Sequence, residues 1–170
     1  SHEWTEGLLD FYHLTGKREA YDKAIGIADN VLRQLASPKF SKLGGSQARE
    51  TGWAMRGLIA VYNETKDEKY LDACKLIAEQ FLAWRAEYGS FLAPYTSHTQ
   101  VRVPFMIAIA VNALYRYYEA TGDDRIPHLI VEEMGDVLDH CVLADGRFFY
   151  KELSSLHRRS DFTLQMEALA

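Results

Sequence analysis

The sequence is poor in cysteine. Cys74 and Cys141 are the only two among its 170 residues, and both fall in stretches with helical spacing. We therefore predict two buried, reduced thiols in place of a disulfide. Reduced thiols weakly favour a cytoplasmic location, although an exported protein with buried cysteines would show the same composition.

Long apolar runs and an excess of positive charge are also missing. No apolar run approaches the roughly 18 residues that a membrane helix needs, and no signal peptide opens the chain. The formal net charge is −5, and the lysines and arginines do not form a basic stripe. We therefore expect neither a membrane nor nucleic acid among the partners.

Common metal, phosphate and nucleophile motifs are absent as well. The segment 2–6 has Glu6 where a zincin motif would place its second histidine, and His2 and Glu6 alone are too few for a metal site. Gly44-Gly45-Ser46 lacks the lysine and the preceding strand of a phosphate loop. Neither cysteine has a nearby histidine pattern that suggests a nucleophile. We predict no metal and no cofactor.

A helical hairpin, present three times, is the main positive feature. With 48% hydrophobic and 25% charged residues, the chain can bury one sizeable core. Apolar residues recur at helical spacing on both sides of a polar turn at 65–68, where Asp67 is placed to cap the second helix. The same turn pattern recurs about every fifty residues: Tyr12, Thr15 and Gly16; Tyr62, Thr65 and Lys66; Tyr118, Thr121 and Gly122.

This repeat predicts an all-α fold of stacked antiparallel hairpins, because one hairpin cannot bury its apolar face alone. We place the hairpins at about 2–36, 49–89 and 102–143, with the start of a fourth at about 160–170. We therefore predict that residues 1–170 form one incomplete domain of a larger ring or solenoid. Open apolar faces at its ends predict self-association. A short strand is also possible at 147–150.

The connections differ in length. Turns within hairpins have about five residues, whereas connections between hairpins have twelve or more, and long connections usually carry function. Each long connection leads into the first helix of a hairpin. We therefore expect the long connections and the N-terminal ends of the first helices to gather on one face, which is the candidate site.

Two motifs resemble a known family. They are Trp4 to Leu9 together with Tyr12, Thr15 and Gly16, and Arg49 to Trp53 together with Gly57 and Leu58. With the repeat, they resemble the six-hairpin glycosidase-like α/α toroids, which include unsaturated glucuronyl hydrolases, β-L-arabinofuranosidases and polysaccharide-lyase relatives. The resemblance implies inner first helices, outer second helices and sugar binding at the inner-helix N-termini. Three hairpins would form part of an (α/α) toroid, about half a ring.

Three glutamates are the candidate catalytic acids or bases: Glu3, Glu6 and Glu50. Glycoside hydrolysis commonly uses two carboxyl groups across the scissile bond, one protonated and one ionised. Glu3 and Glu6 share a helix face, and Glu50 starts the neighbouring inner helix. The alternative for each is that a carboxylate in a first helical turn complements the helix macrodipole.

Arginines at the same helix starts are candidate anion clamps: Arg49, Arg102 and Arg159, or Arg158 in place of the last. A cation there opposes the helix dipole unless a negative group offsets it. A uronate could do so through bidentate pairing, and so could an internal carboxylate. Both explanations stay open at this point.

Aromatic and histidine side chains complete the candidate face. Trp53 and Tyr95 are the best sugar-stacking candidates, whereas Phe105 suits the core better. The other aromatic residues expected there are Phe40, Phe149 and Tyr150. His98 could serve as a general base, above all in a lyase, or could simply be a solvated loop residue.

The predicted function is therefore a carbohydrate-active enzyme domain. It would be a glycoside hydrolase or a polysaccharide-lyase-like domain, with uronate-containing saccharides among its substrates. Two alternatives remain: a helical-repeat protein-interaction module on the same concave face, and a sugar epimerase on the same toroid. Deep convergence of glutamate and arginine would favour the enzyme, and a shallow groove would favour the interaction module.

Overall fold

The computed structural model describes residues 5–37, 48–94 and 100–152. It contains six helices and one pair of two-residue strands in that part of the chain. The elements are α1 (Thr5–Thr15), α2 (Arg18–Leu35), α3 (Ala48–Thr65), α4 (Glu68–Tyr88), β1 (Ala93–Pro94), β2 (Gln100–Val101), α5 (Pro104–Thr121) and α6 (Arg125–Cys141). The predicted all-α class is confirmed, and the extent of the domain stays a prediction. Glu3, Tyr95, His98, Arg159 and the fourth hairpin at 160–170 lie outside the described residues.

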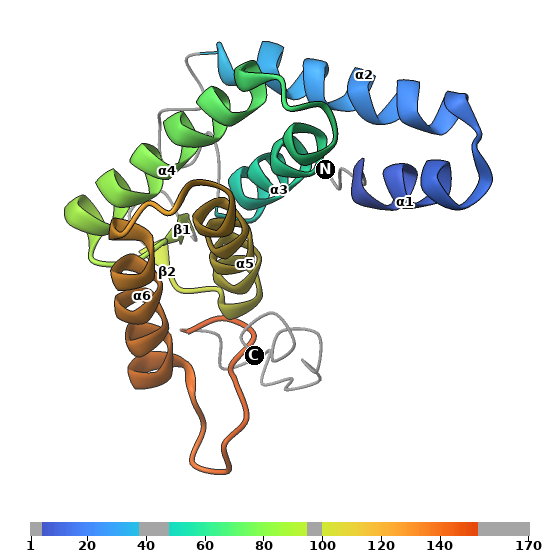
Figure 1. Cartoon of the computed structure of the whole chain (residues 1–170). Helices are drawn as coiled ribbons and strands as arrows, with labels where there is room; N and C mark the ends of the chain where they lie inside the picture. Colours follow the sequence, from blue (N-terminus) through green and yellow to red (C-terminus); the bar gives the residue numbers. More distant parts are fainter. Residues whose placement is uncertain (1–4, 38–47, 95–99, 153–170) are drawn as a thin grey trace.

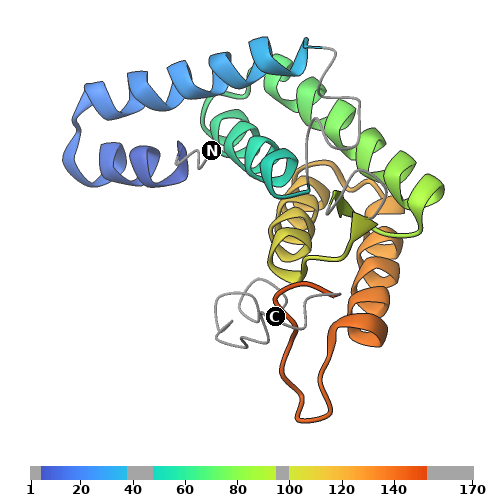
Figure 2. The same cartoon turned by 180° about the vertical axis from the view of Figure 1, so that it is seen from behind.

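The three hairpins form an open arc. Figure 1 shows α2, α4 and α6 along the outside of the arc and α1, α3 and α5 along its inside, and the reverse view in Figure 2 agrees. The inner helices contact one another in chain order, with the largest interface between α3 and α5. The expected division into inner first helices and outer second helices is therefore confirmed.

The repeated turn has one conformation in all three hairpins. The threonine hydroxyl donates to the carbonyl four residues earlier, at 2.6 to 2.8 Å, and accepts the backbone N–H two residues later, at 3.2 to 3.3 Å. The next residue is left-handed, with φ of 69° at Gly16, 57° at Lys66 and 69° at Gly122. Asp67 caps α4 as predicted, accepting a hydrogen bond from the N–H of Lys69 at 3.1 Å.

The inner helices approach closely because small residues separate them. A Cβ atom on Gly52 would lie 2.9 Å from the Cα of Ala110, so α3 and α5 meet almost backbone to backbone. On the other side of α3, the buried Thr5 hydroxyl donates to the carbonyl of Gly57 at 3.1 Å. Links between α1 and α3 join residues 50 to 52 positions apart, which shows that these helices run parallel in one register.

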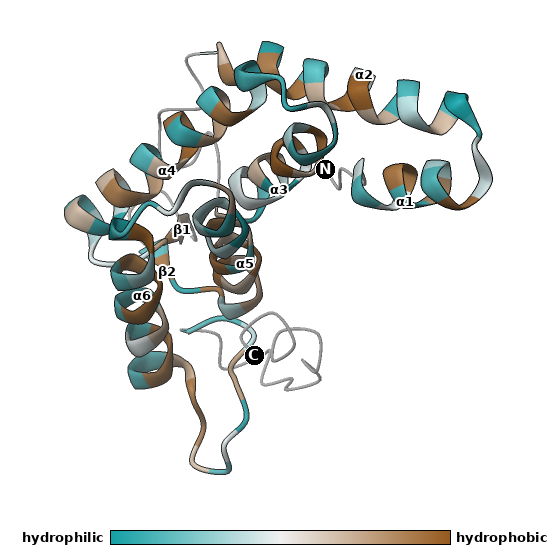
Figure 3. Cartoon of the chain, in the orientation of Figure 1, coloured by the Kyte–Doolittle hydropathy of each residue, from teal (hydrophilic) through white to brown (hydrophobic). Residues whose placement is uncertain are grey.

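The core lies between the inner and outer layers. Figure 3 shows α5 coloured hydrophobic over most of its length, and Ile107, Ala110 and Leu114 are fully buried. Cys74 and Cys141 are buried free thiols, as predicted. Burial raises the pKa of Cys74 strongly and that of Cys141 to about 12, so neither thiol is a ready nucleophile.

The described parts of the connections contain little regular structure. β1 and β2 pair antiparallel, with Ala93 opposite Val101. The predicted strand at 147–150 is wrong, because the segment forms only an isolated bridge between Val142 and Phe148. None of the helices in the described ranges is long and apolar enough to cross a membrane.

Candidate saccharide site on the concave face

A polar stripe runs along the concave side of α3. Glu50, Trp53, Arg56, Ala60 and Asn63 follow one another at intervals of three or four residues, which places them on one face of the helix. These side chains start at the N-terminal turn of α3 and end near its hairpin turn. The inner helix therefore presents polar groups along the inside of the arc.

Glu6 links all three inner helices through a charged group that we name the concave cluster: Glu6, Arg56 and Arg116. Glu6 Oε2 accepts hydrogen bonds from Nε and Nη2 of Arg56 on α3, at 3.1 and 2.8 Å. Glu6 Oε1 accepts from Nη1 of Arg116 on α5 at 2.5 Å. Because two guanidinium groups share one carboxylate, the cluster keeps one positive charge in excess.

Aromatic and amide groups extend the concave cluster in both directions. The guanidinium carbon of Arg56 lies 5.2 Å from the ring centroid of Trp53. On α5, Arg116 Nε donates to Asn112 Oδ1 at 3.2 Å. Both arginines are thus held in place by neighbours on their own helix as well as by Glu6, and their positions are set before any ligand arrives.

An open hollow of about 380 Å³ borders the concave cluster towards the hairpin turns. Its lining residues are Glu6, Leu9, Asp10, His13, Ala60, Asn63, Glu64 and Arg116. His13 Nε2 and Glu64 Oε2 are 2.8 Å apart across α1 and α3. This mixture of carboxylates, an amide and a guanidinium suits a ligand that carries many hydroxyl groups.

At the other end of the stripe, Arg49 and Glu50 form an ion pair in the first turn of α3. Arg49 Nε donates to Glu50 Oε1 at 3.0 Å, and its Nη2 makes a second contact with the same oxygen. Glu50 Oε2 is buried and has no hydrogen-bond partner among the described residues. A buried carboxylate oxygen in this state is costly, so this position is unusual for a purely structural residue.

The structure does not bring the carboxylates of Glu6 and Glu50 together. α1 begins beside the middle of α3, so Glu6 meets Arg56, six residues after Glu50. Six residues correspond to roughly 9 Å along a helix. Glu6 and Glu50 therefore lie at different depths of the concave face, and each has its own arginine partner.

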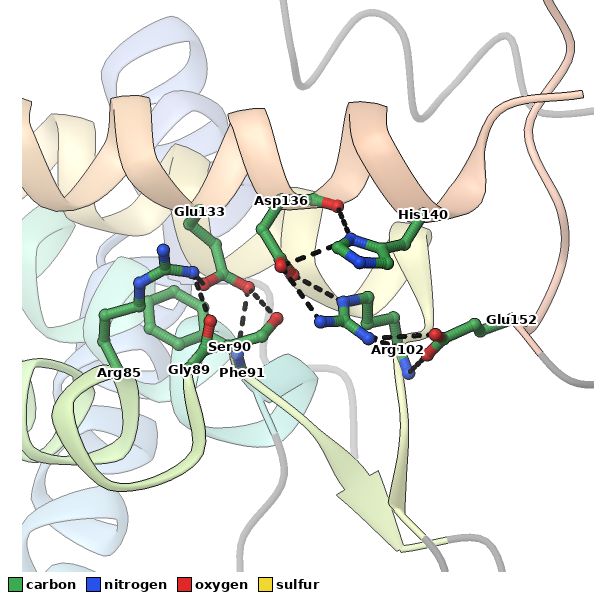
Figure 4. Close-up of polar contacts among 9 residues, drawn as sticks. All are labelled: Arg85, Gly89, Ser90, Phe91, Arg102, Glu133, Asp136, His140 and Glu152. Carbon is green, nitrogen blue, oxygen red and sulfur yellow. Dashed lines mark hydrogen bonds and ion pairs between the residues drawn. The ribbon is translucent and has the colours of Figure 1, made fainter.

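Arg102 lies in a second charged group, which is drawn in Figure 4. This group ties the connection between α4 and α5, and the segment after α6, to helix α6. Nε and Nη2 of Arg102 donate to the carboxylate of Asp136 on α6, at 2.5 and 2.9 Å. Its Nη1 donates to both oxygens of Glu152, at 2.9 and 3.0 Å. Hydrogen bonding to Asp136 raises the pKa of Arg102 further above its usual value. Internal carboxylates therefore offset this arginine, as the alternative explanation allowed.

Glu133 lies on α6 one turn before Asp136. It binds the start of the connection between α4 and α5. Its Oε1 accepts from the Ser90 hydroxyl at 2.7 Å and from the N–H of Phe91 at 2.9 Å, and Arg85 Nη1 lies 3.3 Å from its Oε2. The side chain is fully buried. We name Glu133 and Asp136, with their partners Arg85 and Arg102, the α6 anchor (Figure 4).

Three residues of the concave face escaped the sequence-based prediction: Arg56, Asn112 and Arg116. A signal for two of them was present. Asn112 and Arg116 are four residues apart in a helix that is otherwise apolar over its first two thirds, so they share one face. Polar residues at that spacing on an inner helix indicate a polar interior. Among the described residues, no group of three or more potential metal ligands was found.

Residues 1–155 match a family described as β-L-arabinofuranosidase, GH127 catalytic domain. The chain belongs to this family. Because the match covers most of the sequence, it confirms the predicted likeness to six-hairpin glycosidase-like toroids and identifies a glycoside hydrolase-like, carbohydrate-active domain. No curated protein sequence matches the chain.

A solved structure supports the fold of this GH127 domain. An unsaturated glucuronyl hydrolase from Streptococcus agalactiae superposes with a TM-score of 0.68 at 18% sequence identity. The match covers 87% of this chain and 37% of the hydrolase. At this identity the likeness shows the α/α toroid fold, and the chain spans well under half the length of that enzyme.

Proposed function

We propose that this domain supplies part of the sugar-binding and catalytic site of a glycoside hydrolase, with the saccharide bound on the concave face. The observation that carries the proposal is the concave cluster, where α1, α3 and α5 each contribute a charged side chain beside an open hollow. Inner helices that only packed against each other would not need these charges, since partly buried ion pairs add little stability.

Within this site we assign acid–base chemistry to Glu50. One of its oxygens is held by Arg49, and the other is buried without a hydrogen-bond partner in the described chain, so this carboxyl group has one acceptor position left unused. Both oxygens of Glu6 accept hydrogen bonds from guanidinium groups, so the role of Glu6 is to orient Arg56 and Arg116. Glu3 stays a predicted second carboxyl group.

The proposed substrate is a saccharide that can carry a uronate. Arg116 supports this, since its side chain is 38% exposed and its guanidinium group could pair with a sugar carboxylate. Arg102 and Arg49 are already paired with protein carboxylates and support the site indirectly. Tyr95, His98, Arg159 and Trp53 stay predicted contacts, with Trp53 held beside Arg56.

The test is turnover by the full chain of two substrates: an aryl β-L-arabinofuranoside and an unsaturated uronyl disaccharide. We expect turnover of at least one, and Glu50→Gln should lower kcat by at least about 100-fold with an unchanged Tm. The matched control is Glu68→Gln, an exposed glutamate in the first turn of outer helix α4. Equal turnover by both variants would remove Glu50 from catalysis.

We also propose that the domain self-associates and works in a reducing compartment. Leu14 is 85% exposed and Phe11 is 44% exposed on the first described hairpin, and exposed apolar side chains of this size favour association. Mass measurement in solution tests this, with a concentration-independent monomer as the opposing result. The two buried free thiols support the compartment, and oxidant-sensitive unfolding would test it.

A further inference from the structure

Two aromatic rings stack at the start of α5. The ring centroids of Phe105 and Tyr150 are 5.5 Å apart and the ring planes are inclined by 26°. Phe105 is the second residue of α5, and Tyr150 belongs to the connection that follows α6. Both side chains are half-buried, and Phe105 also packs against the buried residues Val101 and Val103.

The pair lies at the end of the concave face where the inner helices begin. Phe105 precedes Asn112 by seven residues and Arg116 by eleven, which places all three on one face of α5. The contact between Gly52 and Ala110 fixes the register of the parallel helices α3 and α5. Five residues before that contact, Phe105 is level with the start of α3, about one turn before Glu50 and its ion pair with Arg49.

Arg102 and Glu152 clamp the two chain segments that carry these rings. The backbone N–H of Arg102 donates to Glu152 Oε2 and the N–H of Glu152 donates to the Arg102 carbonyl, both at 3.1 Å. The guanidinium of Arg102 then joins this clamp to Asp136 on α6, as Figure 4 shows. Each ring thus lies within three residues of a clamped position.

We propose that Phe105 and Tyr150 form a stacking surface for a sugar ring next to Glu50, and that Arg102 and Glu152 are positioning residues for it. The proposal rests on the saccharide site inferred above. Sugar rings present apolar C–H faces that pack on aromatic planes. The Nζ atom of Lys151 lies 5.9 Å from the Tyr150 ring centroid, so a stacked sugar would meet an ammonium group, which favours an acidic sugar.

The experiment compares Tyr150→Ala with Tyr150→Phe in the full chain, using the unsaturated uronyl disaccharide and the aryl arabinofuranoside. Tyr150→Ala should raise KM by about 5- to 10-fold with kcat within about twofold, and Tyr150→Phe should restore KM because it keeps the ring. Glu152→Gln should raise KM in the same direction by a smaller factor. The control is Tyr118→Ala, a partly exposed tyrosine on the opposite side of α5.

Lys151→Met separates the charge from the stacking. It should raise KM for the uronyl substrate alone, and an equal rise for both substrates would overturn the preference for an acidic sugar. A KM for Tyr150→Ala within twofold of wild type would overturn the stacking surface itself.

If wild type turns over neither substrate, the proposed hydrolase activity fails, and the stacking surface is tested by titration of the uronyl disaccharide followed by tyrosine and tryptophan fluorescence. Binding that Tyr150→Ala loses and Tyr150→Phe retains would support the surface. Absence of binding by wild type, or equal binding by all three proteins, would overturn it.

Discussion

The concave cluster and the α6 anchor use the same side-chain chemistry in different surroundings. In the concave cluster, the side chains of Glu6, Arg56 and Arg116 are 28%, 24% and 38% exposed. In the α6 anchor, those of Glu133, Asp136 and Arg102 are 0%, 12% and 18% exposed. One group borders an open hollow, and the other is enclosed by chain.

The difference shows which charges are available to a ligand. Arg102 donates from Nε and both Nη atoms to two carboxylates, so its hydrogen-bonding capacity is largely used within the protein. Arg116 donates one hydrogen bond to Glu6 and one to Asn112, and it also lines the hollow. A more buried, more fully paired group holds the fold together, whereas a more exposed group with unused hydrogen-bond donors can bind a ligand.

The largest expected effect is on the stability of the α6 anchor. Glu133→Ala leaves the Ser90 hydroxyl, the Phe91 N–H and Arg85 without their buried acceptor, so we expect a loss of about 3 kcal/mol in the free energy of unfolding. Urea unfolding measures it. The adjacent Glu132, 61% exposed and also beside Arg85, is the control, and Glu132→Ala should change little. Similar losses in both variants would contradict the role of the anchor.

Substituting one arginine from each group tests the comparison directly. Arg102→Gln removes the cation shared by two partly buried carboxylates, Asp136 and Glu152, and should cost about 2 kcal/mol of stability. The saccharide KM should rise modestly, through displacement of the Phe105 and Tyr150 rings. Arg116→Gln should cost about 0.5 kcal/mol and raise KM more strongly. Thermal unfolding and initial-rate kinetics on both variants decide, and the reverse ranking of stability losses would break the distinction.

Stability should also depend on pH in opposite ways at the two carboxylates of the anchor. Burial raises the pKa of Glu133 despite hydrogen bonds from Phe91 and Ser90. As pH falls, Glu133 is therefore protonated in the folded state before it is protonated in the unfolded state. The protein gains stability over this range, until pH reaches the unfolded value of 4.5. Burial also pushes the pKa of Asp136 upward, but hydrogen bonding to Arg102 lowers it overall. Its contribution is therefore lost as pH falls below the unfolded value of 3.8.

Urea unfolding between pH 3 and pH 7 checks these signs. Glu133→Gln should flatten the dependence above pH 4.5, and Asp136→Asn should flatten it below pH 3.8. A Glu133→Gln curve parallel to wild type above pH 4.5 would refute the raised pKa.

The smallest expected change in the free energy of unfolding is at a hairpin turn, outside both charged groups. Lys66 adopts a left-handed conformation where the other two hairpins have Gly16 and Gly122. Lys66→Gly should stabilise the protein by about 0.5 kcal/mol, because relief of backbone strain slightly exceeds the added freedom of the unfolded chain and the loss of the contact with Tyr62. Chemical unfolding measures the gain, and Gly122→Lys should show the opposite sign.

Much of the local structure could be predicted. The spacing of Tyr62, Thr65 and Lys66 recurs because one turn needs a hydroxyl that bonds in both directions and a residue that tolerates positive φ. Asp67 acts as a helix cap through a contact only two residues away. These features depend on neighbours in sequence, so they are visible in the residues themselves.

The candidate site was predicted less completely. Glu50, Arg49 and Arg102 lie at the starts of inner helices as expected, but Arg102 pairs with Asp136, 34 residues away. Arg116 meets Glu6 across 110 residues. No local sequence pattern predicts the pair of Arg116 and Glu6, because this pairing depends on how far α1 is offset along α3.

The sequence by itself determined the three hairpins, their short turns and the division into inner and outer helices, because helix periodicity and turn chemistry are local. Only the tertiary structure decided which charges are enclosed and which face the hollow. The physical reason is that burial and ion pairing depend on distances between helices, and these are set by close packing at Gly52 and by the offset of α1 along α3.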